Sequence, residues 1–472
     1  MGANSLELTT YDHEVIRYYR TSFSELYHTK NPRYSLFSVM LTVAERSPIV
    51  MHLILALAGR EIDLKRGDLI EGEGEEEHRD ARLISKPKSR ALHHYSTALG
   101  LMAEVVGHMQ GGEAGGVDPD CILTALYLML MYERMFGSEQ GLANHLAGAA
   151  IIVRQHCADL ARPRLLAREP PGGTAPDQHV AFSRTAQPGS EPQISQYSAR
   201  LLVRVAFLDA EATSYGIGGE VIGTLYKVMG RQVGSSTAFS PQHGFESLER
   251  YAVTLYRNVW GESYPQTELA EDIENRPVFA LLSACLQIRF MISQLSNILD
   301  RGEDASQPIS SVQYAIQATG EHFADLLARA NGLSLATDGS RCFVANLRFI
   351  VPYYHSVILE FLRLTAASPG LELDGRQRAA LRGIMNLAVQ AFRHEGDKAM
   401  LRIARPLFMV ALETDDVLHR EWVIERFKGL GSFGARFGRA REFLLRTIDM
   451  QQALGRRVDL QERFRISLEG II

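Results

Sequence analysis

From residue 121 to residue 132 the chain is apolar on nearly every side, and no charged residue interrupts it before Glu133. A helix with such a surface is stable only when other elements enclose it. Apolar residues at every third or fourth position, typical of amphipathic helices, recur on both sides, for example in 245–259 and 381–392. Convincing runs of alternating apolar and polar residues do not occur. The sequence therefore predicts an all-α fold, a large multi-helix bundle with long exposed loops.

Residues that favour helix ends support this interpretation. Ser47-Pro48 and Asp118-Pro119 each place a capping oxygen before a proline, a pattern typical of a helix start. Gly261 follows one apolar stripe, and Gly429 and Gly431 follow another, as expected for left-handed helix ends. Around the apolar helix at 121–135 we expect further helices near 12–28, 36–46, 48–64, 89–110 and 139–157.

Two segments interrupt the helical pattern. Residues 71–80 hold six acids and one arginine, and residues 161–193 are rich in proline and glycine. Both compositions are typical of exposed loops. We expect a helical part at 11–160, a flexible insertion at 161–193 and a helical part at 194–472. Both helical parts are apolar enough to pack together, so the whole chain, 1–472, is interpreted as one superdomain.

Charge and cysteine content exclude several classes of protein. Fifty basic and fifty-five acidic residues give a net charge of -5, whereas a self-sufficient nucleic-acid binder usually has a basic excess. The four cysteines, separated by 36, 128 and 57 residues, do not form a zinc-binding or dithiol pair, and we expect neither a metal nor a cofactor. The first eleven residues lack the pattern of a signal peptide. The apolar runs at 121–132 and 278–288 are shorter than the roughly 20 residues of a spanning helix, so no membrane span is expected.

Motifs for catalysis are weak. Gly429-Leu-Gly431-Ser-Phe-Gly434 matches a dinucleotide-binding pattern but follows a helix, and Ser85-Lys-Pro-Lys88 spells SxxK beside the acidic loop. HExxH, Walker A and GxSxG motifs are absent. Spacing does not assign a partner to any of several histidines, so no catalytic residue is predicted. The basic carboxy-terminal segment interleaves acids with arginines, which favours a compositional bias over phosphate contact. The histidines are His93, His94, His145, His355 and His419, and the arginines are Arg439, Arg441, Arg446, Arg456, Arg457, Arg463 and Arg465.

Several motifs follow one another in a recognisable order between about residues 11 and 450. They are Tyr18-Tyr19-Arg-Thr, Ser47-Pro48-Ile-Val-Met-His52, Ala91-Leu-His-His-Tyr95, Asp120-Cys-Ile-Leu-Thr-Ala-Leu-Tyr127, Gly141-Leu-Ala-Asn-His145, Phe207-Leu-Asp209-Ala, Ser214-Tyr-Gly-Ile-Gly-Gly219 and Arg405-Pro406-Leu-Phe-Met-Val-Ala-Leu-Glu413-Thr-Asp-Asp416. Together they resemble the fungal-specific transcription factor domain, of the second regulatory subtype, found downstream of six-cysteine binuclear zinc clusters.

The resemblance implies an all-helical regulatory module in the nucleus, shuttling with the cytoplasm, that controls a metabolic or secondary-metabolite pathway. Its implied partners are a hydrophobic small-molecule effector, the transcription machinery or a DNA-binding relative, and a second copy in a homodimer. The six-cysteine cluster is missing, so we do not expect these 472 residues to bind DNA autonomously. A longer gene product, a regulator acting through partners and a scaffold recruited for another task all stay open.

We expect a ligand near residues 405–433. There an apolar pocket could form with Arg405 as its polar anchor, lined by Phe408, Met409, Trp422 and Phe433. The simpler alternative is that these aromatic and methionine side chains only fill the core. Two other functions are possible for the whole chain. One is an enzyme that uses the same cavity and a histidine or carboxylate for proton transfer; the other is a dimerising inhibitor of a full-length relative.

Overall fold

A computed structural model describes residues 6–27, 29–71, 90–110, 118–156, 194–213, 216–229, 245–337, 341–366 and 370–460. Within these ranges the chain is helical and contains no strand; an isolated bridge joins Gly370 and Arg456. The prediction of an all-α multi-helix fold is confirmed. Several predictions fall outside the described residues: most of the acidic loop, the 161–193 insertion, the SxxK motif, Cys157, Arg463 and Arg465.

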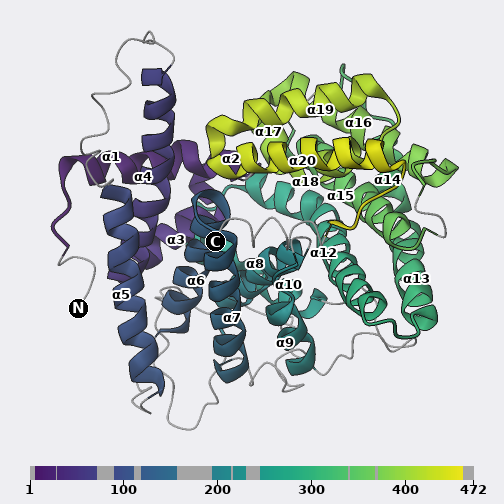
Figure 1. The fold of residues 1–472 in the computed structure, drawn as a ribbon. Coiled ribbons are helices and arrows are strands. Elements are labelled where there is room, and N and C mark those ends of the chain that lie inside the picture. The colour runs from purple at the N-terminus through teal and green to yellow at the C-terminus, as the bar shows by residue number, and fades with distance from the viewer. Residues whose placement is uncertain are drawn as a thin grey trace.

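The amino-terminal helices surround one apolar helix (Figure 1). Every residue of α6 from Ile122 to Tyr132 is buried, which confirms that this helix is enclosed. Helix α4 packs along α5 and α6, and α6 also contacts α3, α7 and α8. The bounds are α1 Thr10–Tyr18, a π-helical turn Tyr19–Phe23, α2 Ser24–Tyr27, α3 Leu36–Ala44, α4 Pro48–Glu71, α5 Arg90–Gln110, α6 Pro119–Phe136 and α7 Glu139–His156. All five helices predicted around α6 are present, the first of them with the π-helical turn inside it.

Both predicted helix starts are confirmed, and one predicted helix end is wrong. The Asp118 carboxylate accepts the N–H of Asp120 at 3.0 Å, and the Ser47 hydroxyl accepts the N–H of Val50 at 3.4 Å. Gly261 has a positive φ of 52°. Gly429, however, has a right-handed φ of -60°, because α19 continues into a 3₁₀ turn, Leu430–Phe433, that also contains Gly431. The positive φ, 149°, belongs to Gly434.

The middle of the chain forms long helices. The bounds are α8 Gln196–Ala212, α9 Glu220–Val228, α10 Glu246–Tyr251, a 3₁₀ turn Ala252–Thr254, α11 Leu255–Trp260, α12 Gln266–Asp300, α13 Ser306–His322, α14 Ala324–Asn331 and α15 Cys342–Leu364. The segment 245–259 is thus two short helices joined by a tighter turn, although its apolar stripe is buried as predicted. A 3₁₀ turn keeps nearly the same direction as an α-helix, so the stripe survives the change.

Helices α12 and α15 are long and apolar enough, by length and composition, to cross a membrane. The apolar run at 278–288 therefore belongs to a much longer helix than the run itself indicates. The apolar windows of the two helices are 83% and 72% buried inside the protein, and α12 packs along α15. Core helices pass the same test of length and composition, so this is weak evidence for a span.

The carboxy-terminal helices form a second core that packs against the first (Figure 1). They are α16 Gly375–Glu395, α17 Asp397–Arg402, α18 Ala404–Glu413, α19 Val417–Gly429 and α20 Ala435–Leu454. Helix α20 contacts α6, and the turn before it contacts α4. The first core contains side chains from both sides of the insertion, which supports the interpretation as one superdomain; that interpretation stays a prediction.

Candidate functional site

A cavity of about 170 Å³ lies where the amino-terminal helices meet the carboxy-terminal ones. We call it the junction cavity. Its walls come from α6, α7, α8, α15 and α17–α20, so segments far apart in the sequence close it. The residues that line it include Glu133, Arg134, Leu208, Glu211, Tyr353, Arg405, Phe408, Phe427, Phe437, Ala440 and Phe443.

Two of the five predicted ligand residues line the junction cavity. Arg405 and Phe408 are adjacent on one face of α18, and the Arg405 guanidinium lies 5.6 Å from the centre of the Phe408 ring. Phe408 stacks against Phe443 of α20, with ring centres 6.1 Å apart. Phe427 and Phe437 extend this apolar wall. Arg405 shares the cavity lining with Arg134, Arg436 and Arg439, which the sequence did not single out for this site, and a ligand at Arg405 and Phe408 stays a prediction.

The other three predicted residues lie elsewhere. Met409 lines a neighbouring cavity of about 320 Å³. Trp422 packs edge-on against Phe392 of α16, with ring centres 5.9 Å apart, and Phe433 packs against the second core. For these two residues, core packing is what the structure shows.

Arg405 is held by a buried carboxylate. Glu360 of α15 receives two hydrogen bonds from Arg289 of α12, both 3.0 Å, and one of 3.3 Å from Arg405. Burial by itself raises the pKa of Glu360, but the two guanidinium groups outweigh it and lower the pKa to about 2. Arg405 therefore reaches the cavity as part of an ion-pair cluster that joins α12, α15 and α18.

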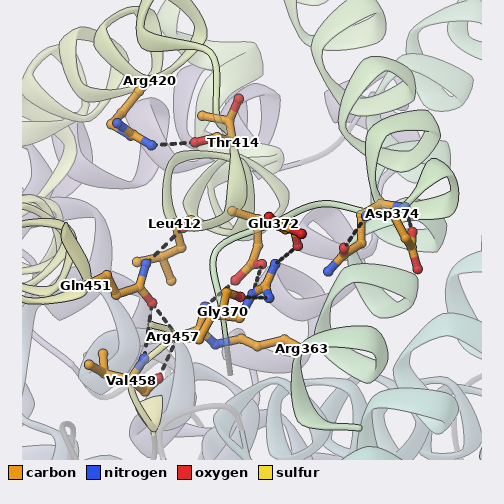
Figure 2. A network of polar contacts seen from close by, with 12 residues as sticks. Arg363, Gly370, Glu372, Asp374, Leu412, Thr414, Arg420, Gln451, Arg457 and Val458 are labelled. Atoms are coloured by element: carbon orange, nitrogen blue, oxygen red, sulfur yellow. Dashed lines mark hydrogen bonds and ion pairs between the residues drawn. The ribbon is translucent and has the colours of Figure 1, made fainter. Parts of the chain in front are cut away.

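A network of polar contacts around Arg363 and Arg457 organises the carboxy-terminal end of the fold (Figure 2). Glu413, at the end of α18, is paired with Arg363 of α15 and, at 2.7 Å, with Arg457. Arg363 also donates to Gln451 at 2.6 Å, and Arg457 donates to the carbonyl oxygen of Gly370. The network ties the segment after α20 to α15, α18 and the loop before α16. Arg457, which we considered for phosphate contact, is buried in it.

A second cavity considered for binding, of about 340 Å³, lies between α8, α10, α11 and α12, with α13 and α15 at its edge. We call it the α8 cavity. Its charged residues include Arg200 and Arg204 of α8, Glu249 of α10 and Arg276 of α12. The sequence did not single out these residues. A signal was present, because Arg200 and Arg204 are one helical turn apart within an otherwise apolar stretch of α8.

Two side chains of the α8 cavity have altered acidity. Burial raises the pKa of Glu249 to about 7, against the opposing effect of Arg200, Arg204 and Arg276. Burial, together with the neighbouring Arg200, lowers the pKa of Arg204. Both shifts mean that the low-dielectric surroundings oppose the charged forms.

The histidines that we considered for proton transfer make contacts mainly within the amino-terminal helices. His94 contacts Asp12 at 3.3 Å and His52 at 2.9 Å, and His145 contacts Tyr95 at 3.0 Å. His355 is half-buried, and its removal from water lowers its pKa to about 4. Within the described residues, no group of three or more histidine, cysteine, aspartate or glutamate side chains could hold a metal ion.

The family model of the fungal specific transcription factor domain matches residues 14–174, about a third of the chain. The matched part includes α2–α7 and most of α1, and of these helices α6 and α7 line the junction cavity. No curated protein and no solved structure matches the chain.

The chain is therefore similar to the fungal specific transcription factor domain over residues 14–174, and the predicted resemblance is confirmed for that range. The wider resemblance, to about residue 450, stays a prediction.

Proposed function

We propose that this chain is a transcription regulatory protein of fungal type that acts in the nucleus and controls a metabolic or secondary-metabolite pathway. The observation that carries the proposal is the match of residues 14–174 to the fungal specific transcription factor domain. The absence of an alternative catalytic motif in the sequence agrees with it. Shuttling with the cytoplasm stays a prediction.

We propose that the regulator responds to a hydrophobic small molecule in the junction cavity. A ligand there would touch α6 and α7 of the matched domain on one side and α18–α20 on the other. If the ligand fits one arrangement of these two groups of helices better, it shifts the population toward that arrangement, by no more than its difference in affinity. The phenylalanines of α18–α20 would contact the ligand, and Arg405 would contact a polar group on it.

The regulator would reach DNA through a partner, either a DNA-binding relative or the transcription machinery. The chain has a net charge of -5, and Arg457 is buried beside Glu413, which leaves less basic surface for phosphate. We also propose that two copies of the chain can form a homodimer.

A tethering experiment tests the proposed function. The full chain is fused to an unrelated DNA-binding domain, and expression of a reporter with the matching operator is measured in a fungal host. We expect the fusion to change reporter expression relative to the DNA-binding domain alone. Ala440→Phe, which puts an aromatic ring into the junction cavity, should lock the reporter in one state. A fusion that never changes expression contradicts the regulatory role, and a variant that responds like wild type contradicts the cavity's part in it.

One observation favours the alternative of an enzyme. Glu133 lines the junction cavity and accepts a hydrogen bond of 2.6 Å from Tyr95, whose hydroxyl also contacts His145 at 3.0 Å. Such a carboxylate could transfer protons to a ligand. If purified protein converts a hydrophobic molecule, and if Glu133→Gln stops the conversion, the enzyme is the better description.

A further inference from the structure

We propose that the α8 cavity binds a small molecule that carries one carboxylate on an apolar body, with Arg204 as the anchor of the carboxylate. The proposal concerns binding alone. It does not depend on a role in transcription or on the junction cavity.

The size and the walls of the α8 cavity fit a ligand with an apolar body. The cavity of about 340 Å³ lies at the lower end of the range for small-molecule sites, roughly 300–1,000 Å³. The apolar walls of the cavity come from α8, from α12, and from the 3₁₀ turn Ala252–Thr254 together with α11. The residues are Val203, Phe207, Ala252, Tyr256, Phe279 and Ala280.

Arg204 is the cation best placed to hold an anion. It lines both the α8 cavity and an adjoining cavity of about 140 Å³. Its guanidinium lies 6.0 Å from the centre of the Phe279 ring, and among the described residues it has no ion pair or hydrogen bond. Arg204 is half-buried, and a guanidinium that is partly withdrawn from water without a carboxylate is unfavourable, so a ligand carboxylate would supply the missing partner.

The charge balance of the cavity depends on the protonation of Glu249. Lys30 is neutralised by Glu268 at 3.0 Å and Asp272 at 2.7 Å. Glu246 is paired with Arg250 at 2.5 Å. Lys30 offsets only one of its two carboxylates, so its group keeps one negative charge, which the set of Arg200, Arg204, Arg276, Glu249 and Glu271 balances. The cavity is therefore neutral when Glu249 is ionised and has one positive charge in excess when Glu249 is protonated.

The ionisation of Glu249 makes the binding of an anion in the α8 cavity depend on pH. Arg200 and Arg204 of α8, and Arg276 and Ser283 of α12, act on its carboxyl group. Lys30, Glu246, Glu271, Asp272, His322 and Cys342 line the same cavity. When Glu249 is protonated it no longer repels a ligand carboxylate, and it can donate a hydrogen bond. Anion binding should therefore strengthen as the pH falls from 8 to 6.

Three ligands that share one apolar body but differ in charge test whether the cavity prefers an anion. Binding of 4-phenylbutyrate, 4-phenyl-1-butanol and 4-phenylbutylamine to the full chain is measured by calorimetry at pH 7. We expect the acid to bind about tenfold or more tightly than the alcohol, because it gains a charge-assisted pair with Arg204. Arg204→Met should reduce affinity for the acid to that for the alcohol and leave the alcohol unaffected. Arg257→Met, at an exposed arginine of α11, is the matched control and should change none of the three.

A second variant keeps the test decisive if Arg204→Met does not fold. Ala280→Phe fills the cavity from α12 and should abolish binding of the acid. The proposal is overturned if the amine binds best, if acid and alcohol bind equally, if no acid binding is detected, or if acid affinity survives Arg204→Met or Ala280→Phe in a folded protein.

Discussion

At the residue scale, the buried carboxylates are more informative than the histidines. Glu413 is the clearest case, because its side chain is fully buried and is shared by Arg363 and Arg457. Glu413→Gln keeps the shape of the side chain but leaves two buried guanidinium groups without a counter-charge. We expect a loss of about 3–5 kcal/mol in the free energy of unfolding, measured by urea denaturation.

The control for Glu413→Gln is Glu303→Gln, which removes an exposed pair with Arg301. We expect little change there, because water solvates both charges in either state. Equal effects of the two substitutions would show that the Glu413 network does not stabilise the fold.

At the element scale, the turn between α8 and α9 depends on glycine. The Asp209 carboxylate accepts the N–H groups of Gly219 at 2.8 Å and Ile222 at 2.9 Å, which holds the start of α9 against the end of α8. Gly218 has a φ of +81°, and a Cβ there would lie 2.6 Å from the carbonyl oxygen of Asp209. Gly218→Ala should cost about 1–2 kcal/mol from backbone conformation, and the clash adds to this. Thermal unfolding followed by circular dichroism measures the effect.

A helical glycine provides the opposite control. Gly100 is exposed in α5, and a Cβ at this position meets open space. Gly100→Ala should stabilise the protein by about 0.5–1 kcal/mol, because alanine loses less backbone entropy on folding. If both substitutions stabilise, the turn at Gly218 is not constrained as described.

At the scale of the whole molecule, buried carboxyl groups set the pH of greatest stability. The folded pKa of Glu360, about 2, lies below the unfolded value, so its contribution is lost as the pH falls from about 4 toward 2. The folded pKa values of Asp209, about 6, and Glu249, about 7, lie above the unfolded values. Their contributions are present in acid and are lost as the pH rises through 6 and 7. We expect the melting temperature to be highest near pH 5.

The variant Glu249→Gln checks the upper half of this profile. Its amide cannot ionise, so the melting temperature should fall less between pH 5 and pH 8 than in the wild type. At pH 8 the variant should be the more stable protein, by about 1–3 kcal/mol. Parallel profiles for the two proteins would contradict a raised pKa for Glu249.

The sequence by itself determined the class of fold and most of the helices. Three-to-four residue spacing, proline at helix starts and an apolar segment in α6 are local patterns, and each was sufficient to place an element. Order and spacing of motifs also indicated the resemblance to a known family, and the family model bears out that resemblance for residues 14–174. Gly429 shows the limit of local patterns: its backbone conformation depends on the packing that lets α19 continue into a tighter turn.

Only the tertiary structure decided which side chains share a cavity. Arg405 and Phe408 meet Phe443 because α20 packs against α18, whereas Trp422 lies on another face of α19, against α16. The pairing of Glu360 with Arg289 joins residues 71 positions apart, and Arg204 faces a cavity that six helices enclose. Apolar periodicity specifies that a face is buried but not against what, so contacts between distant segments follow from how the helices pack.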